Sequence, residues 1–261
     1  MFTGYGKIVA GLVSLALLGG CASSSEYEGL QPDELYARGA QEFEAGEWDK
    51  AVEVFERLLF AEPTYPMLVE ARLYLARAYY NKGEFITSVS EFSRILDRNP
   101  GHALAPQASL GICQSFVAQS PHVQRDQTFT VQAWNSCQNT LTDFRGTEVA
   151  AEAEGLRDEM ESRLAEKVFI SGDFHFRRKL YHSGIIYFND LLGQYPNGEW
   201  ASQALLRLYE SYSALEWDVE AGEVRDRLLR EFPDSEAAKM IGADGGGGQA
   251  SGTGAGLEGP S

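Results

Sequence analysis

The chain has 261 residues, of which 38 are acidic and 22 are basic, and its formal net charge at pH 7 is −16. A surface this acidic repels phosphate backbones and anionic lipid headgroups, so nucleic acid is excluded from the expected partners. Hydrophobic residues make up 44% of the chain, which is enough to build a sizeable core.

Residues 1–20 have the features of an export signal. Lys7 is the only charged residue in this segment, an apolar run extends from Ile8 to Leu18, and the small residues Gly19 and Gly20 end it. The apolar run is about half as long as a membrane-spanning helix requires. We therefore expect residues 1–20 to direct export and to be removed.

Cys21 follows this segment directly. Residues 18–21, Leu-Gly-Gly-Cys, resemble the lipobox of bacterial lipoproteins, in which the cysteine is acylated before the signal is cleaved. The alternative is an ordinary secretory signal followed by an incidental cysteine. Acyl chains on Cys21 would bury enough methylene groups for stable anchoring. The resemblance implies a lipidated tether over 21–31, and Ala22 in place of Asp favours the periplasmic face of the outer membrane.

A repeated pattern of large and small residues follows the tether. Two units, 32–65 and 69–102, place small, aromatic, turn and proline residues in the order typical of tetratricopeptide repeats, 37 residues apart. The residues that carry this pattern are Leu35, Gly39, Gly46, Trp48, Ala51, Phe55, Leu58 and Pro63 in the first unit, and Leu75, Ala76, Tyr79, Gly83, Phe85, Ser88, Phe92, Ile95 and Pro100 in the second. Each unit is expected to form two antiparallel helices.

The pattern has a physical reason in the packing of paired helices. A small residue on the first helix, Gly39 or Ala76, allows the second helix to approach, and large side chains fill the groove beside it. Gly46 and Gly83 supply the positive φ that ends the first helix, and a proline stops the second.

Three further units complete the repeat region, at 104–146, 148–198 and 202–235. The third unit is irregular because about ten extra residues, Gln119 to Thr128, fall in its turn, and we expect an exposed loop there. The segment from Thr147 to Arg178 lacks proline, and its apolar residues recur at helical spacing. This segment predicts one helix of about thirty residues that joins the third unit to the fourth.

Together these units predict an all-α fold, an α-solenoid of five tetratricopeptide-like hairpins over 32–241. We expect a right-handed superhelix whose concave wall is lined by the first helix of each unit. Residues 242–261 form a glycine-rich tract with little to bury, and we expect this tail to be disordered. A stack of this kind works by binding other polypeptides.

Several residues of the first two units fall at positions that face the concave wall of such a repeat. They are Tyr36, Phe43, Leu73, Arg77, Tyr80 and Asn81. Phe43 and Tyr80 occupy equivalent places, so we predict a groove with aromatic walls that contains the Arg77 guanidinium. Such a groove suits an extended peptide with an aromatic residue or a C-terminal carboxylate. The alternative is that these aromatic side chains pack on the tether or on the next helix.

Cys113 and Cys137 fall on the two helices of the third unit, and each lies a few residues from the intervening loop. Antiparallel packing would bring them opposite one another, where an oxidising compartment favours a disulfide. The alternative is a pair of small buried hydrophobic side chains.

Enzyme chemistry finds little support in the chain. Asp173, His175 and His182 are close enough in sequence to suggest a metal site, but their spacing does not place three ligands on one helix face. No nucleophile elbow, phosphate-binding glycine loop or Cys-x-x-Cys motif occurs. We therefore expect no catalytic residue, no metal and no cofactor.

The lipobox, the repeats and the long connecting helix together resemble the BamD family, the repeat lipoproteins of the outer-membrane β-barrel assembly machinery. The resemblance spans roughly Cys21 to Ala238 and is most specific in the first unit and from Leu164 to Pro196. It implies that the first hairpins bind C-terminal segments of unfolded outer-membrane proteins. It also implies that the last two hairpins dock on the periplasmic domains of the barrel-forming subunit.

One departure from the family pattern concerns docking. Members of the family carry an arginine on the second helix of the fourth unit that pairs with the barrel-forming subunit, and the aligned place here holds Tyr187. Arg177, Arg178 and Lys179 lie nearby, and we expect Arg177, Arg178 and Tyr187 to take part in docking. An alternative is another periplasmic repeat lipoprotein, of type IV pilus biogenesis or of the Tol-Pal system. The 37-residue spacing and the long helix favour the assembly factor.

Overall fold

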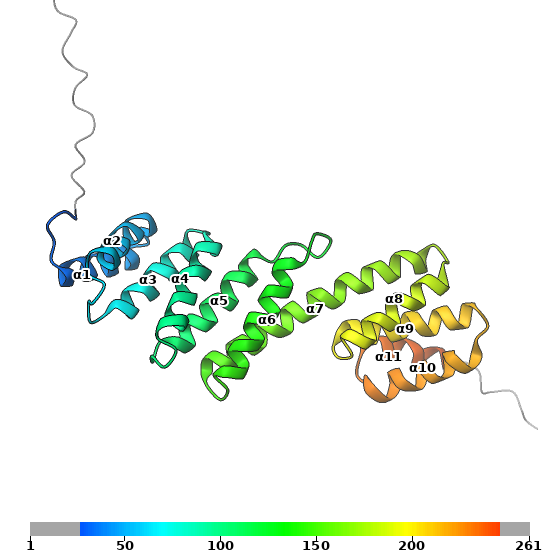
Figure 1. Ribbon diagram of the computed structural model, residues 1–261. Helices are drawn as coiled ribbons and strands as arrows, with labels where there is room; N and C mark the ends of the chain where they lie inside the picture. The colour runs from blue at the N-terminus through cyan, green and yellow to red at the C-terminus, as the bar shows by residue number, and fades with distance from the viewer. Residues whose placement is uncertain (1–26, 246–261) are drawn as a thin grey trace, which may run out of the picture.

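The computed structural model describes residues 27–245, and all regular structure in this range is helical. Eleven helices and no strand occur among these residues (Figure 1). They are α1 (Pro32–Glu44), α2 (Trp48–Ala61), α3 (Leu68–Asn81), α4 (Phe85–Arg98), α5 (Ala105–Gln119), α6 (Thr128–Asp143), α7 (Glu148–Arg177), α8 (Tyr181–Gln194), α9 (Glu199–Ala214), α10 (Asp218–Glu231) and α11 (Glu236–Gly245). The signal segment, Cys21 and residues 246–261 lie outside the described residues.

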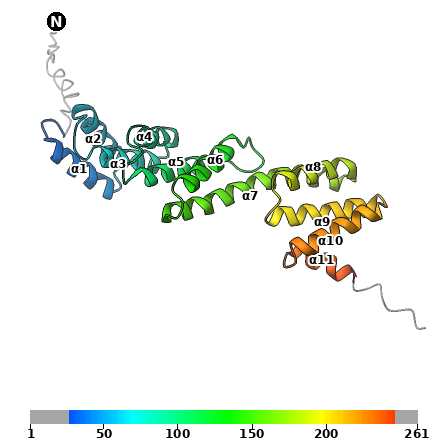
Figure 2. The same ribbon diagram turned by 60° about the horizontal axis from the view of Figure 1, so that its bottom comes forward.

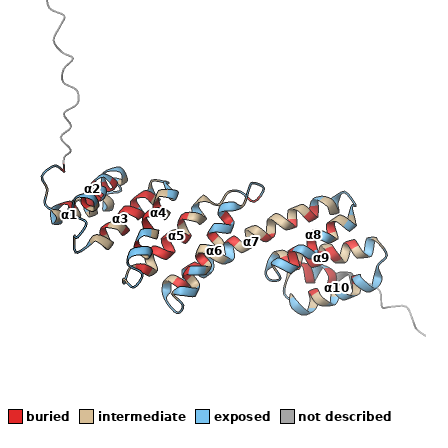
Figure 3. Ribbon diagram, in the orientation of Figure 1, coloured by how far each residue is buried: buried red, intermediate tan, exposed pale blue. Residues whose placement is uncertain are grey.

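Consecutive helices pair into five hairpins, α1–α2 to α9–α10, that follow one another along the molecule (Figure 1). The first helices of neighbouring hairpins also touch: α1 with α3, α3 with α5, α5 with α7 and α7 with α9. Among residues 27–245, the second helices of neighbouring hairpins do not touch one another. The first helices therefore form a continuous wall, and the predicted all-α solenoid is confirmed. Buried residues lie on the faces that the helices turn toward one another (Figure 3).

Close packing in this stack depends on glycines that lie against buried phenylalanine rings. The pairs are Gly39 with Phe55, Gly111 with Phe92, and Gly172 with Phe188. A Cβ atom on these glycines would lie 2.8, 2.4 and 2.6 Å from the ring, respectively, closer than side-chain atoms approach. Two of the pairs lie within a hairpin, whereas Gly111 and Phe92 join the second hairpin to the third.

The hairpin turns share one hydrogen-bonding pattern. In four of them, the backbone N–H after a positive-φ residue donates to the carbonyl five residues earlier, as in a Schellman motif. Gly46 and Gly83 take this conformation with φ of 77° and 80°, as predicted. The last two hairpins place Lys179 and Glu216 there, with φ of 60° and 59°. Both non-glycine residues occupy a conformation that costs backbone energy.

The predicted long helix is confirmed as α7, which has 30 residues. The Thr147 hydroxyl accepts a hydrogen bond from the Ala150 N–H and caps its N-terminus. The first part of α7 packs on α5 and α6, and the later part packs on α8 and α9, so one helix belongs to two hairpins (Figure 2). Among the described residues, no helix combines the length and the apolarity needed to cross a membrane.

An eleventh helix, α11, was not predicted. Its first residues extend the chain beyond the fifth hairpin, and Ala237, Ala238 and Ile241 are buried against α9 and α10. The helix continues to Gly245, so the tail does not begin at Gly242 as expected from composition. Spacing of one and four residues puts the three apolar side chains on one helix face. That face covers the end of the stack.

Candidate partner-binding surfaces

In the structure, some residues of the predicted concave groove are packed in the core and others are accessible. The rings of Tyr36 and Phe43 lie edge-on to Tyr74, with centroid distances of 6.2 and 5.2 Å, and both are half-buried in the core of the first two hairpins. Leu73 is only 6% exposed and packs in the core between α3, α4 and α5. Tyr36 and Phe43 thus follow the alternative in which the aromatic side chains pack on the next helix, and the prediction of an open groove was wrong for Leu73. The side chain of Tyr74 reaches the first hairpin and fills the space that the groove required.

Arg77, Tyr80 and Asn81 remain accessible at the end of α3. Arg77 and Tyr80 line a hollow of about 360 Å³ that α5 and the first turns of α7 complete. Arg77 forms no ion pair within residues 27–245, and the other charged groups lining the hollow are the carboxylates Glu148 and Glu152. A ligand carboxylate bound to Arg77 would therefore lie near two fixed negative charges, which weakens its attraction.

The three docking candidates make different contacts at the fourth hairpin. Arg177 pairs with Asp173, with 2.6 Å between Nη2 and Oδ2, although 76% of its side chain is exposed. The Arg178 guanidinium lies 4.1 Å from the centre of an aromatic ring, that of Phe174. The ring of Tyr187 stacks on His175 at 5.3 Å with an angle of 12°. Tyr187 thus presents a partly exposed aromatic surface where the resemblance led us to expect a cation.

Exposed apolar side chains gather on the last two hairpins. Of the twelve large hydrophobic residues exposed within residues 27–245, half lie between residues 174 and 219. They are Phe174, Leu180, Ile186, Tyr187, Trp217 and Val219. Single exposed apolar residues are common, but Phe174 and Tyr187 both contact the His175 ring, so these two exposed rings lie close together.

The extra residues of the third hairpin form a folded loop at 120–127, between α5 and α6. Val123 of this loop is buried, and the Gln127 side-chain amide donates to the carbonyls of His122 and Arg125. Hydrogen bonds from Thr128 lower the pKa of the Asp126 carboxyl. Four of the eight loop residues are exposed as predicted, three are half-buried, and Val123 is buried.

The residues considered as metal ligands have separate partners. Asp173 is buried and pairs with Arg177 and with Arg207 of α9, which ties the fourth hairpin to the fifth. His175 stacks on Tyr187, whereas His182 lies edge-on to Trp217 at 5.5 Å. Among the described residues, no three His, Cys, Asp or Glu side chains are arranged to hold a metal ion.

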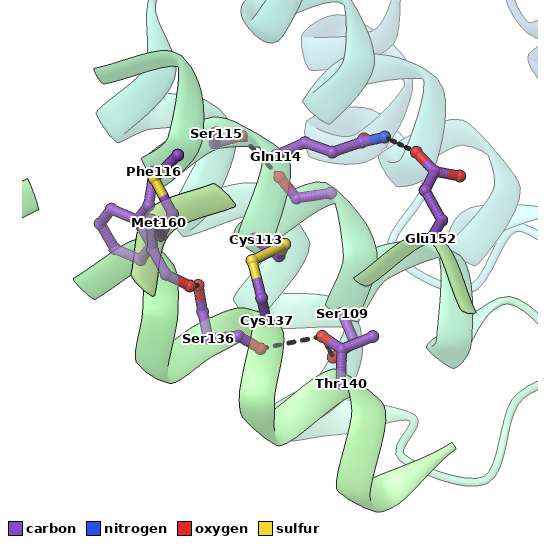
Figure 4. Close-up of a disulfide and its surroundings, with 12 residues drawn as sticks. Ser109, Cys113, Gln114, Ser115, Phe116, Ser136, Cys137, Thr140, Glu152 and Met160 are labelled. Atoms are coloured by element: carbon purple, nitrogen blue, oxygen red, sulfur yellow. Dashed lines mark hydrogen bonds between the residues drawn. A yellow bond between two sulfur atoms is a disulfide. The ribbon is translucent and has the colours of Figure 1, made fainter. Parts of the chain in front are cut away.

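A disulfide joins Cys113 of α5 to Cys137 of α6 across the third hairpin (Figure 4). The two Cα atoms are 4.8 Å apart, and both side chains are fully buried. One turn away, the hydroxyls of Ser109 and Thr140 lie 2.7 Å apart in the same interface. The disulfide thus lies where antiparallel packing was expected to bring the two cysteines together.

Sequence reasoning missed two aromatic residues of the surface along α7, namely Phe174 of α7 and Trp200 of α9. Phe174 is half-exposed, and Trp200 lies 5.1 Å from the ring of Phe169. A signal was present, because Phe174 falls outside the series of apolar positions that predicted the buried face of α7. A large aromatic residue outside the pattern of buried positions is a candidate for contact with a partner.

Comparison with known proteins shows which family the chain resembles. The solved structure "TPR2AB-domain:pHSP90-complex of yeast Sti1" is 14% identical, with a TM-score of 0.45, and the alignment covers 82% of each chain. The protein of Caulobacter vibrioides named outer membrane protein assembly factor BamD is 24% identical over 86% of this chain and 75% of its own length. The protein of that name from Rickettsia prowazekii is also 24% identical, over 88% and 93%. A family profile described as "YfiO: Outer membrane lipoprotein" matches residues 28–228. The chain therefore belongs to this family of outer membrane lipoproteins.

Proposed function

We propose that this chain is a non-catalytic scaffold of outer-membrane β-barrel assembly, held by a lipid on Cys21 at the periplasmic face of the outer membrane. The observation that carries the proposal is the match of residues 28–228 to an outer membrane lipoprotein family whose relatives are named assembly factors. The continuous wall of first helices and the exposed apolar side chains of the last hairpins are consistent with binding other polypeptides.

In this proposal the last two hairpins dock on the periplasmic domains of the barrel-forming subunit, and Arg177, Arg178 and Tyr187 contribute to the contact. The test is crosslinking in intact membranes followed by purification of the chain through an affinity tag. We expect recovery of a large barrel protein with repeated periplasmic domains. Tyr187→Asp should reduce that recovery, because a charge would replace the stacked ring at the surface.

The matched control is Phe60→Asp, which places the same charge on a side chain that is 91% exposed at the other end of the stack. It should leave the recovery unchanged. Recovery of pilus or cell-division components in place of a barrel protein would refute the assignment to barrel assembly.

The first hairpins are proposed to receive C-terminal segments of unfolded outer-membrane proteins through Arg77, Tyr80 and Asn81. Arg77 is the single positive charge lining its hollow, so Arg77→Glu leaves only acidic groups among the charged lining residues. We expect the Kd of a peptide with a C-terminal aromatic residue and a free carboxylate to rise about tenfold or more in fluorescence anisotropy.

Arg98→Glu is the matched control for this measurement, because Arg98 is an exposed arginine at the end of the neighbouring second helix, α4. It should leave the peptide Kd and the helical content unchanged. If Arg77→Glu also left the Kd unchanged, the hollow would not be the client-binding site.

A further inference from the structure

A groove of about 610 Å³ runs along the C-terminal half of α7, away from the Arg77 hollow. Its lining comes from three parts of the chain: two successive turns of α7, the start of α9 at Trp200, and the inserted loop at Gln124. Neither the loop nor Trp200 belongs to the docking candidates that the sequence supplied.

The floor of the groove is aromatic. Phe169 is nearly buried and its ring lies 5.1 Å from that of Trp200, which holds both rings in place. One turn later Phe174 is 51% exposed, so about half of a large apolar side chain is available to a partner. Rings of this kind favour an aromatic partner in offset or edge-on contact.

One end of the groove is cationic. Arg177 uses its guanidinium to bind Asp173, but a guanidinium has five N–H donors and most of this side chain is exposed. The Arg178 guanidinium lies over the Phe174 ring, a contact that restricts its position. Asp173 is the one carboxylate among the described lining residues, and it is already neutralised by Arg177 and Arg207. In a chain with a net charge of −16, this is a local site for negative charge.

The inserted loop is built as a wall of this groove. The Lys167 ammonium of α7 donates to the carbonyls of Gln124 and Arg125, at 3.1 and 3.3 Å, and so holds the loop against the helix. The loop spans residues 120–127, whereas the first two hairpins turn within residues 45–47 and 82–84. Gln124 is the loop residue that lines the groove, so the insertion forms part of its wall on this side.

We propose that loop 120–127, α7 and Trp200 bind an internal segment of a partner protein in which an aromatic side chain lies between acidic residues. The aromatic side chain would pack on Phe174, and the carboxylates would bind Arg177 and Arg178 separately, because the two guanidinium groups are held by different neighbours. The inference rests on the docking function proposed above and names the chemistry of the docked segment.

The test measures binding of a short, amide-capped, fluorescein-labelled peptide with a central Phe between two Glu to the full mature chain in detergent micelles. Phe174→Ser and Arg178→Glu should each raise the peptide Kd about tenfold or more. Gln124→Glu should weaken binding and Gln124→Lys should strengthen it, because residue 124 lines the same groove and a charge there acts on the acidic segment. A peptide with Gln in place of both Glu should bind weakly to every variant.

Phe60→Ser and Arg145→Glu are the controls, since both residues are exposed and lie outside the groove. Circular dichroism verifies that every variant keeps its helical content. The groove assignment is overturned if the acidic peptide fails to bind, binds no better than its Gln counterpart, or binds the Phe174 and Arg178 variants as tightly as the original chain.

The same variants separate this inference from the docking function. If the barrel-forming subunit is still recovered by crosslinking while the peptide does not bind, the groove assignment fails and the docking proposal stands. If the peptide binds through the groove but no barrel protein is recovered, the groove assignment stands and the docking proposal fails.

Discussion

Gly111 and Phe92 show how one small residue determines the fit between successive hairpins. The Phe92 ring is almost fully buried and lies where a Cβ atom of residue 111 would be placed, at 2.4 Å. The ring cannot retreat, because Leu73, Ile95 and Ala108 surround it in the same core. A single methyl group at this point would therefore have to move α4 away from α5.

We expect Gly111→Ala to lower the free energy of unfolding by about 1–3 kcal/mol through overpacking. Thermal and urea denaturation followed by circular dichroism measure the change. Gly155→Ala is the matched control, because Gly155 also lies within a helix but has no atom near its Cβ position. The control should be neutral or stabilising by up to about 1 kcal/mol, since alanine is the better helix former. Equal effects of the two substitutions would contradict the packing argument.

Lys179 and Gly83 occupy equivalent turns but differ in backbone energy. Both have positive φ, of 60° and 80°, yet only glycine adopts this region without a steric penalty. Lys179→Gly should raise the free energy of unfolding by up to about 1 kcal/mol, and Gly83→Ala should lower it by roughly the same amount. Nothing lies within 4 Å of a Cβ at Gly83, so the change in unfolding free energy of Gly83→Ala reflects the backbone conformation and not a steric clash. Denaturation curves that fail to move in opposite directions would argue against strain at Lys179.

The third hairpin, α5 with α6, differs from the others in what holds its helices together. Its contact surface includes the buried hydroxyls of Ser109, Thr130 and Thr140, and its apolar cluster is small. Hydrogen-bonded hydroxyls contribute less to stability than apolar side chains of the same size. The disulfide between Cys113 and Cys137 supplies a covalent link where the apolar core is weakest.

Reduction of this disulfide should destabilise the chain. The bond closes a loop with a sequence separation of 24, for which loop-closure entropy gives a contribution of about 3–4 kcal/mol. Urea denaturation with and without reductant measures the difference. The double variant Cys113→Ala and Cys137→Ala should be destabilised and insensitive to reductant. A chain that unfolds at the same urea concentration in both conditions would show that the link carries no stability.

Burial in the whole molecule is distributed over several clusters rather than gathered in one core. One cluster lies in the first two hairpins and includes Tyr27, another lies in the last two hairpins with α11, and two smaller clusters lie between them along the stack. Tyr27 is only 3% exposed and lies six residues after Cys21, a distance of at most about 20 Å for an extended chain. A lipid on Cys21 would therefore keep the first hairpin close to the membrane surface.

We expect the acyl group to be the attachment of this chain to the membrane. Replacing residues 1–21 by a cleavable signal without a lipobox should move the protein to the soluble periplasmic fraction, because the acyl chains that would anchor it are then missing. Cell fractionation and immunoblotting measure the distribution. Persistence in outer-membrane fractions after a high-salt wash would mean that protein contacts, rather than the lipid, hold the chain there.

Local spacing was sufficient to predict much of this fold. The turn glycines Gly46 and Gly83, the small residue Gly39 and the helix from Thr147 to Arg178 follow from the periodicity of helices and the conformational range of glycine, which are properties of neighbouring residues. The same reasoning failed at Leu73, which faces the next hairpin, and at α11, which is short and stabilised by burial against other helices. Contacts between hairpins depend on how the repeats stack.

The amino-acid sequence by itself therefore determined the helical hairpins, their order and the family resemblance. Only the tertiary structure decided which surfaces are open and what charge they carry. Folding places Glu148 and Glu152 in the hollow of Arg77, which is far from them in the sequence. It also places Arg178 over Phe174, in a groove that Gln124 of the inserted loop lines as well. The physical reason is that electrostatic and apolar complementarity depends on distances in space, and residues far apart in sequence set those distances.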